Sequence, residues 1–162
     1  MTAATGKFNG NVNVTGTLTA SQVYNAVYND YAELFPKGEE TEPGDIIALD
    51  CLSSDEKYIK ARKGSKLIVG VHSNEYAHLI GGEVPPDGED FIQYNLKKYI
   101  PIGLAGRLYV KVIGSIRRGD KITISKYPGI GEKSTNSSDQ IVGYALESGE
   151  FATPGLVKIK IL

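Results

Sequence analysis

Two acidic residues near the N-terminus have the types and the spacing that proton transfer requires. They are Asp30 and Glu33, within the run from Tyr24 to Phe35. Apolar residues of this region fall at helical spacing: Val23, Val27, Tyr31 and Leu34. We therefore expect residues 21–36 to form a short helical connector. On a helix Asp30 and Glu33 are i,i+3 neighbours, and their repulsion favours proton uptake by one of them. The alternative is that both acids face water and have only a structural role.

Other short patterns indicate no metal or cofactor site. His72 and His78 are separated by five residues, without the further ligands that a zinc site needs, so we expect hydrogen-bonded loop residues. Residues 129–134 resemble a phosphate-binding loop only loosely, because Glu132 interrupts the required Gly-Lys step. The single cysteine, Cys51, excludes an intrachain disulfide. We expect neither a metal nor a cofactor.

An arm with a strand-like pattern precedes the acidic pair. Positions 7–19 alternate between apolar and polar side chains, which is the period of a β-strand. The apolar members are Phe8, Val12, Val14 and Leu18. A lone strand cannot bury such a face or pair its own backbone. We therefore expect residues 1–20 to form an extended β arm that winds with two sister copies into a trimeric shaft, with Val27 and Tyr31 continuing the interface. The alternative is an edge strand folded back on its own domain.

Residues 37–162 have the pattern of a β-barrel. Nineteen glycines and seven prolines separate short runs rich in Ile, Val and Tyr. We expect strands at 46–50, 57–62, 67–71, 100–112 (two strands joined at a tight turn), 121–125, 141–146 and 156–162. The stretch 72–97 is polar and irregular, and long loops of this kind tend to be functional or mobile.

Two landmarks recur at nearly equal intervals along this region. A Gly-Asp pair begins at Gly44 and again at Gly119, and a glycine interrupts a short apolar run at Gly70 and again at Gly143. Two copies are too few for a solenoid. The pattern therefore predicts a mainly β fold whose barrel contains an internal pseudo-repeat.

The motif from Asn29 to Glu33, followed by Leu34 and Phe35, resembles the opening signature of a phage domain family. That family is the autoproteolytic intramolecular-chaperone domain at the C-terminal end of tail spikes and neck appendages. The later segments resemble the β-barrel at the ends of phage and prophage fibre proteins: Gly106–Val112, Gly119–Ser125, Pro128-Gly129, Ile141–Leu146 and Leu156–Leu162. The likeness extends over most of residues 24–162.

The resemblance implies a C-terminal module of a tail fibre or tail spike that drives assembly of a homotrimer and continues an upstream fibre shaft. The module would belong to the virion and be made in the bacterial cytoplasm. In the family a Ser-Asp-Tyr-Ala-Glu type sequence marks the point of self-cleavage, which implies Asn29, Asp30 and Glu33 as the catalytic residues of a single-turnover cut. Here Asn29 replaces the serine whose hydroxyl attacks its own carbonyl. An asparagine amide can cyclise onto its carbonyl, but it is a poorer nucleophile and needs strained backbone geometry. Self-cleavage therefore remains an alternative to a purely structural role.

Composition and charge exclude some partners and suggest one more. The net charge of −1 provides no field for nonspecific nucleic-acid binding. No run approaches the roughly 18 apolar residues of a membrane-spanning helix, so we expect no membrane insertion. Ten tyrosines offer flat surfaces for sugars or partner subunits. A third hypothesis is therefore a carbohydrate-binding module that attaches to host-surface glycans through Tyr76 and Tyr94.

Overall fold

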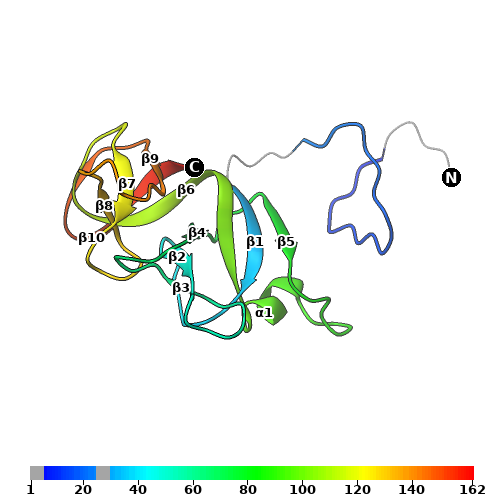
Figure 1. The fold of residues 1–162 in the computed structure, drawn as a ribbon. Coiled ribbons are helices and arrows are strands. Elements are labelled where there is room, and N and C mark those ends of the chain that lie inside the picture. Colours follow the sequence, from blue (N-terminus) through cyan, green and yellow to red (C-terminus); the bar gives the residue numbers. More distant parts are fainter. Residues whose placement is uncertain (1–5, 25–29) are drawn as a thin grey trace.

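The computed structural model describes residues 6–24 and 30–162, and this part of the chain is mainly β with one short helix (Figure 1). The elements in chain order are β1 (Asp30–Pro36), β2 (Ile46–Leu49), β3 (Tyr58–Lys60), β4 (Ile68–His72), β5 (His78–Gly81), α1 (Phe91–Asn95), β6 (Tyr99–Ile116), β7 (Lys121–Ile124), β8 (Gly131–Lys133), β9 (Gly143–Ala145) and β10 (Gly149–Ile161).

The long strand β6 belongs to two sheets. Its first half pairs antiparallel with β1 and β4, and its second half pairs antiparallel with β10 and parallel with β8. The change of partner falls at Gly106, which has a φ of +112° and directly precedes the stretch that pairs with β10. The prediction of two strands joined by a tight turn over 100–112 is therefore wrong. A glycine bends one continuous strand from the first sheet into the second.

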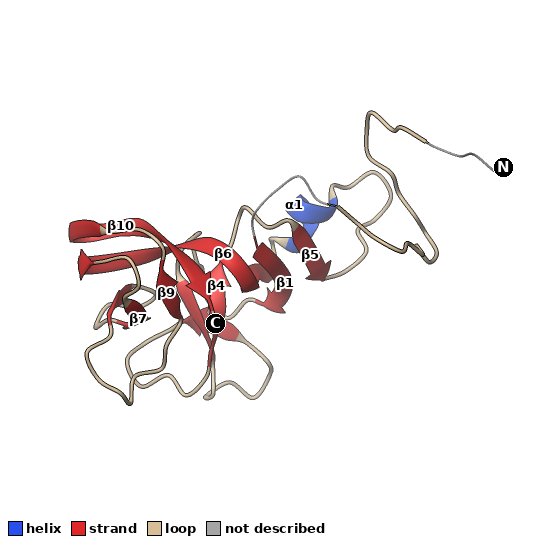
Figure 2. Cartoon of the chain, turned by 90° about the horizontal axis from the view of Figure 1, so that it is seen from above, coloured by secondary structure: helices blue, strands red, loops and turns tan. Residues whose placement is uncertain are grey.

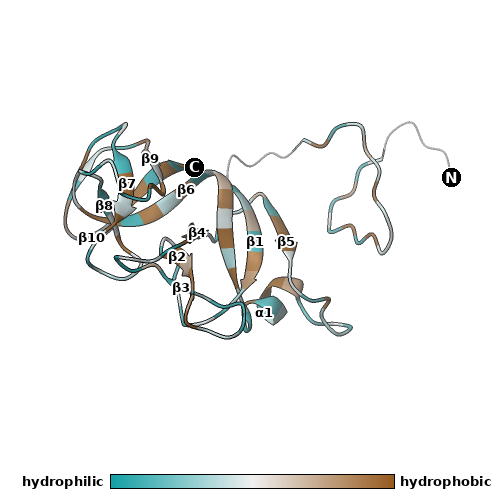
Figure 3. Ribbon diagram, in the orientation of Figure 1, coloured by the Kyte–Doolittle hydropathy of each residue, from teal (hydrophilic) through white to brown (hydrophobic). Residues whose placement is uncertain are grey.

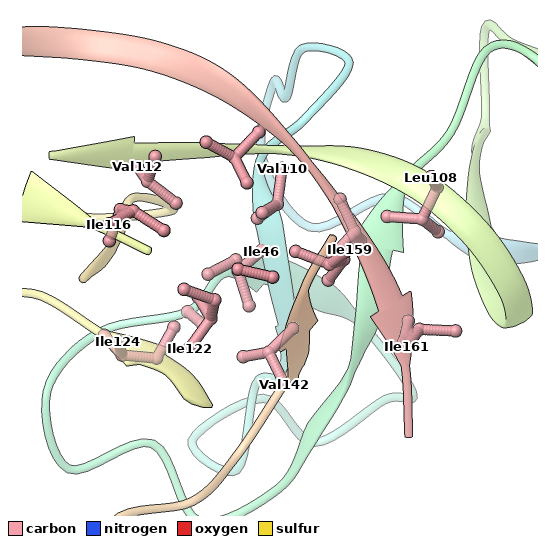
Figure 4. Packing of buried hydrophobic residues seen from close by; sticks show 14 of the residues in the cluster. Ile46, Leu108, Val110, Val112, Ile116, Ile122, Ile124, Val142, Ile159 and Ile161 are labelled. Carbon is pink, nitrogen blue, oxygen red and sulfur yellow. The ribbon is translucent and has the colours of Figure 1, made fainter. Parts of the chain in front are cut away.

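The second sheet closes into a barrel. Its strands follow the order β6, β8, β7, β9 and β10, and β10 pairs again with β6. Hydrophobic and polar residues alternate along β6 (Figure 3), because successive side chains of a strand point to opposite faces. The inward residues are almost all aliphatic, and Ile46 from β2 joins them, so the first sheet contributes to the same core (Figure 4).

The first sheet carries the N-terminal strand. Its order is β5, β1, β6, β4, β2 and β3, and Figures 1 and 2 show β5, β1 and the first half of β6 side by side. β1 is parallel to β5 and antiparallel to β6. A smaller apolar cluster, formed by Ile47, Tyr58, Ile100 and Ile102, lies in this sheet.

The repeated landmarks occupy matching local structures in the two halves. Gly44 and Gly119 have φ values of +89° and +88°, and in both turns the next aspartate accepts a hydrogen bond from the backbone nitrogen three residues earlier. Gly70 and Gly143 both lie so close to a neighbouring strand that an added Cβ would collide with its backbone oxygen. These glycines are therefore required by left-handed turns and by close strand packing.

The helical connector expected over 21–36 is wrong for the part that the structure describes, because residues 30–36 form β1. Their helical spacing is overridden by pairing on both strand edges. Residues 25–29, which include Val27 and Asn29, lie outside the described part of the chain.

The expected β arm is also not seen. Residues 6–24 form no strand, and every one of them is exposed. Residues 6–24 therefore do not fold back as an edge strand of their own domain. The loop 72–97 contains β5 and α1, so the expectation of irregular structure there is wrong in part. Across the ranges 6–24 and 30–162, no helix has the length and hydropathy needed to cross a bilayer.

Candidate functional site

Asp30 is the first residue of β1, and its side chain is completely buried. One carboxyl oxygen, Oδ1, accepts a hydrogen bond of 2.9 Å from the Ser73 hydroxyl. The other oxygen, Oδ2, is the one buried side-chain nitrogen or oxygen atom in residues 6–24 and 30–162 that has no hydrogen-bond partner. Buried polar atoms are rarely left unpaired without a functional or structural reason. Asp30 is therefore the strongest candidate for a chemical role.

The loop between β4 and β5 holds Asp30 at two points. Ser73 contacts the carboxyl group, and the backbone nitrogen of Ala77 donates to the main-chain oxygen of Asp30 at 2.9 Å. The Ser73 hydroxyl in turn accepts a hydrogen bond of 3.4 Å from the backbone nitrogen of Glu75. Residues 73–77 therefore surround the first residue of β1 with polar contacts.

An aromatic contact between Tyr31 and His78 holds the exposed face of β1 next to β5. Tyr31 stacks on His78 with 4.6 Å between ring centroids and 5° between ring planes. The two residues face each other in the parallel register of β1 and β5. This stack holds the start of β1 against β5 beside the buried carboxyl.

Gly103 of β6 makes room for the Asp30 side chain. A Cβ added at Gly103 would collide with Oδ2 of Asp30 and with a methyl group of Leu108. Oδ2 therefore lies against the space left by the missing side chain of Gly103.

This environment favours the neutral form of the carboxyl. Burial raises the pKa of Asp30 above its usual value, the hydrogen bond from Ser73 lowers it in part, and the negative charge of Glu75 raises it further. Desolvation penalises a charged group more than a neutral one. The charged form of the Asp30 carboxyl is therefore more costly than that of an ordinary surface carboxylate.

A cavity of about 560 Å³ lies next to this group. Its lining combines Asp30 and Ser73 with side chains from the loop, β6 and β10, among them Glu75, Arg107, Tyr109 and Lys158. Acidic, basic and hydroxyl groups therefore meet beside the start of β1. Within the ranges that the structure describes, no three of the His, Cys, Asp and Glu side chains come together as metal ligands.

The predicted partnership between Asp30 and Glu33 is wrong. Side chains alternate along a strand, so the two acids point to opposite faces of β1, and they are about 10 Å apart along the strand. The acid that acts on Asp30 is Glu75, from the loop. No specific signal in the sequence pointed to Ser73 or Glu75 beyond the length and polarity of the 72–97 segment. Asn29, the third residue of the predicted site, lies outside the described part.

The two tyrosines proposed for glycan binding lie in different surroundings. Tyr76 lines a second cavity of about 420 Å³ together with His72 and Ile92. Tyr94 is not part of that lining; its hydroxyl donates to Glu83 at 3.2 Å, and the ammonium of Lys98 lies 5.3 Å from its ring centre. Tyr94 therefore does not line the cavity to which Tyr76 contributes.

The residues expected at a trimer interface are exposed in the single chain wherever the structure describes them. The exposed fractions are 76% for Phe8, 58% for Val12, 47% for Val14, 72% for Leu18 and 58% for Tyr31. Exposed apolar side chains on an arm without strand partners are a surface that a further chain could cover.

Comparison with known proteins identifies a related fold. No family model and no curated protein matches the sequence. The crystal structure of the pre-mature bacteriophage phi29 gene product 12 is similar with a TM-score of 0.67 and 18% identity, over 92% of this chain and 24% of that chain. The crystal structure of the phi29 gene product 12 C-terminal fragment is similar with a TM-score of 0.54 and 21% identity, over 82% of this chain and 100% of the fragment. This chain thus spans about a quarter of the pre-mature phage protein, and its fold is one that occurs both in that pre-mature protein and in its C-terminal fragment.

Proposed function

We propose that this chain is the C-terminal assembly module of a phage or prophage tail fibre or tail spike, and thus part of a virion. The observation that carries the proposal is the match to a complete C-terminal fragment of a phage gene product, which the chain covers over its full length. The closed barrel and the first sheet form a well-packed domain. The exposed apolar arm in front of it is suited to join an upstream shaft.

Assembly would occur through three copies of the arm. Their apolar faces would be buried along a common axis, which removes from water the side chains that one chain leaves exposed. Light scattering on the purified chain should therefore give about three times the monomer mass of 17.5 kDa. A mass near 17.5 kDa at micromolar concentration would contradict the proposal.

A matched pair of variants locates the interface. Val12→Asp combined with Val14→Asp places two charges on the apolar face and should yield monomers, because unpaired charges cannot be buried at a shared axis. Asn11→Asp combined with Asn13→Asp adds the same charge to the polar face of the same arm and should leave the trimer intact. If both double variants dissociate the trimer equally, the added charge alone explains the effect and the apolar face is not the interface.

A second candidate function is self-cleavage at the bond between Asn29 and Asp30. Two observations favour it. The Asp30 carboxyl is buried, unpaired at one oxygen and biased toward its neutral form. The structures to which this chain is similar also include both a pre-mature form and a C-terminal fragment of phi29 gene product 12.

The cut would start from the asparagine. The side-chain amide nitrogen of Asn29 would attack its own main-chain carbonyl carbon, close a cyclic imide and expel the nitrogen of Asp30. Intact-mass measurement during incubation of the purified chain should then show a piece that begins with Asp30 and a partner piece that ends in the imide or its hydrolysis product. Asn29→Ala removes the nucleophile and should stay full length. If the wild-type chain remains entirely full length after incubation, the self-cleavage proposal is wrong.

A further inference from the structure

The outer face of the barrel carries a row of basic and aromatic side chains. Successive side chains of a strand point to opposite faces, and Figure 4 shows Leu108, Val110 and Ile159 packed in the core. The residues between them therefore project outward. Cross-strand pairing aligns four outward residues in one row: Lys121 of β7, Tyr144 of β9, Lys160 of β10 and Arg107 of β6.

This row is open to solvent. It is about 14 Å long, because it crosses three gaps between neighbouring strands. Lys121, Lys160 and Arg107 are exposed, and Tyr144, between the two lysines, is 37% exposed. The Lys160 ammonium donates to the main-chain oxygen of Ile161, a contact that leaves its positive charge in place. The row therefore presents three cations and one aromatic ring along a line.

The charge of this face is positive. Five lysine or arginine residues and no aspartate or glutamate occur in the strand segments that form it, which are 107–111, 121–124, 143–145 and 156–162. Acids from neighbouring turns reach only its margin. Lys111 donates to Glu42 and Asp45, and Lys158 lies 4.0 Å from Glu147. The positive charge is therefore concentrated on the row itself.

The cavity of about 560 Å³ adjoins one end of the row, since Arg107 and Lys158 both line it. Tyr109 also lines the cavity, and the Lys158 ammonium lies 4.8 Å from its ring centre. Another part of the lining comes from the loop after β4, where Asn74 and Glu75 are exposed. Cationic groups bind carboxylates, whereas an amide and a carboxylate accept hydrogen bonds from hydroxyl groups. The cavity thus offers partners for both kinds of group.

We propose that this row and the adjoining cavity bind an acidic polysaccharide, a chain of sugar rings that carry carboxylate groups. One sugar ring stacks on Tyr144, whose flat amphipathic face suits it, and Lys121 and Lys160 bind carboxylates on either side. Arg107 binds the carboxylate of the sugar that enters the cavity, and Glu75 accepts hydrogen bonds from the hydroxyl groups of that sugar. This inference goes beyond assembly and depends neither on the arm nor on the cut.

A polynucleotide suits the same face less well. Its phosphate groups accept hydrogen bonds but donate none, so beside Glu75 they meet a like charge. The net charge of −1 also provides no long-range field that attracts a polyanion without specific contacts. A sugar ring offers hydroxyl donors to the Glu75 carboxylate, which is the chemistry that this end of the row requires.

Calorimetric titration of the full chain tests the proposal. The probes are oligosaccharides of alginate and of polygalacturonate, with neutral dextran and a DNA oligonucleotide of matched charge as controls. We expect both acidic sugars to bind, with an affinity that falls as salt is added, and dextran to give no heat. DNA should bind about 10-fold more weakly, because it makes no hydrogen bond to Glu75. If neither acidic sugar binds, or if dextran or DNA binds equally well, the proposal is wrong.

A matched pair of double variants locates the site. Lys121→Gln combined with Lys160→Gln should weaken alginate binding by about 10-fold, because two ion pairs are lost. Lys97→Gln combined with Lys126→Gln removes the same charge from exposed lysines outside the row and should leave the affinity nearly unchanged. Equal weakening by both pairs would show that only net charge matters, which contradicts a site on this face.

Two single variants test the sugar-specific contacts. Tyr144→Leu keeps an apolar side chain without the ring and should weaken alginate binding by about 5-fold. Glu75→Gln should weaken alginate binding yet strengthen DNA binding, since only the sugar uses the carboxylate. If Glu75→Gln strengthens the binding of both, the face is a general polyanion surface and the sugar assignment is wrong. Light scattering separates this result from assembly: a monomer that binds alginate would support this inference and contradict the trimer.

Discussion

At the scale of single residues, the Asp30 carboxyl is stable in the neutral form and costly in the charged form. Its pKa is raised by burial, so it contributes stability below the pKa of the unfolded chain and loses that contribution as pH rises through its folded value. A cost of this kind is typical of functional sites, where stability is given up for a group held in an unfavourable environment.

Asp30→Asn mimics the neutral acid and should therefore stabilise the domain at neutral pH. We expect the free energy of unfolding to rise by about 1 kcal/mol at pH 7, and this gain should shrink as the pH is lowered and the wild-type carboxyl takes up its proton. Urea denaturation of both proteins at several pH values measures the effect. A gain that stayed constant down to acid pH would show that charge burial is not its cause.

Gly103→Ala should have the opposite effect, because the new methyl group meets Oδ2 of Asp30 and the side chain of Leu108. We expect a loss of about 2 kcal/mol in urea denaturation, as for other overpacked cores. Gly10→Ala is the control, since nothing lies within 4 Å of its added Cβ. In an Asp30→Ala background the loss at Gly103 should be smaller, because one of the two colliding groups is gone.

Sequence reasoning singled out Asp30 from its residue type and neighbours, and the structure buries that side chain. The helical spacing of the nearby apolar residues, however, paired Asp30 with Glu33 instead of Glu75. Ser73 and Glu75 are distant in sequence and reach Asp30 only because β4 and β1 both pair with β6. No local pattern contains that information.

At the scale of elements, β6 joins the two sheets into one folding unit. Its first half contributes Ile102 to the smaller cluster, and its second half contributes Val110 to the barrel core. Both side chains are fully buried. Since one continuous strand contributes to both clusters, neither sheet should unfold alone.

Ile102→Ala and Val110→Ala should therefore each shift a single cooperative unfolding transition. We expect losses of about 3 kcal/mol for Ile102→Ala and about 2 kcal/mol for Val110→Ala, with circular dichroism and tyrosine fluorescence giving the same midpoint. Leu52→Ala, at a side chain that is 98% exposed, should change little. Two separate transitions in either core variant would mean that the sheets fold independently.

Periodicity predicted some elements well and others poorly for a physical reason. The alternation at the end of the chain, where Val157, Ile159 and Ile161 point inward, identified the C-terminal part of β10 but not its start at Gly149. The same rule missed the continuity of β6, because Gly103 and Gly106 look like turn residues in the sequence. Because glycine has no side chain, Gly103 can lie close to Asp30, and Gly106 can bend β6 from one sheet into the other.

At the scale of the whole molecule, the domain from residue 30 onward should not depend on the arm. Residues 6–24 are exposed and form no strand with the domain. A chain limited to residues 30–162 should therefore unfold within about 0.5 kcal/mol of a full-length monomer. The monomeric comparator is the Val12→Asp, Val14→Asp variant, and urea denaturation is the measurement. A clearly less stable truncated chain would show that the arm supports the domain.

The pairing of β1 along both edges also determines how this domain would carry a mechanical load. Tension that arrives from the upstream chain enters at Asp30 and acts along the axis of β1, while the hydrogen bonds to β5 and β6 lie across that axis. Under such a pull all the hydrogen bonds of β1 resist together, because the force shears them. A force across the strand would instead break the bonds one after another from the end. Mechanical force alone should therefore detach the upstream chain only with difficulty. Cleavage of the peptide bond in front of Asp30 would release the upstream chain and leave both sheets intact.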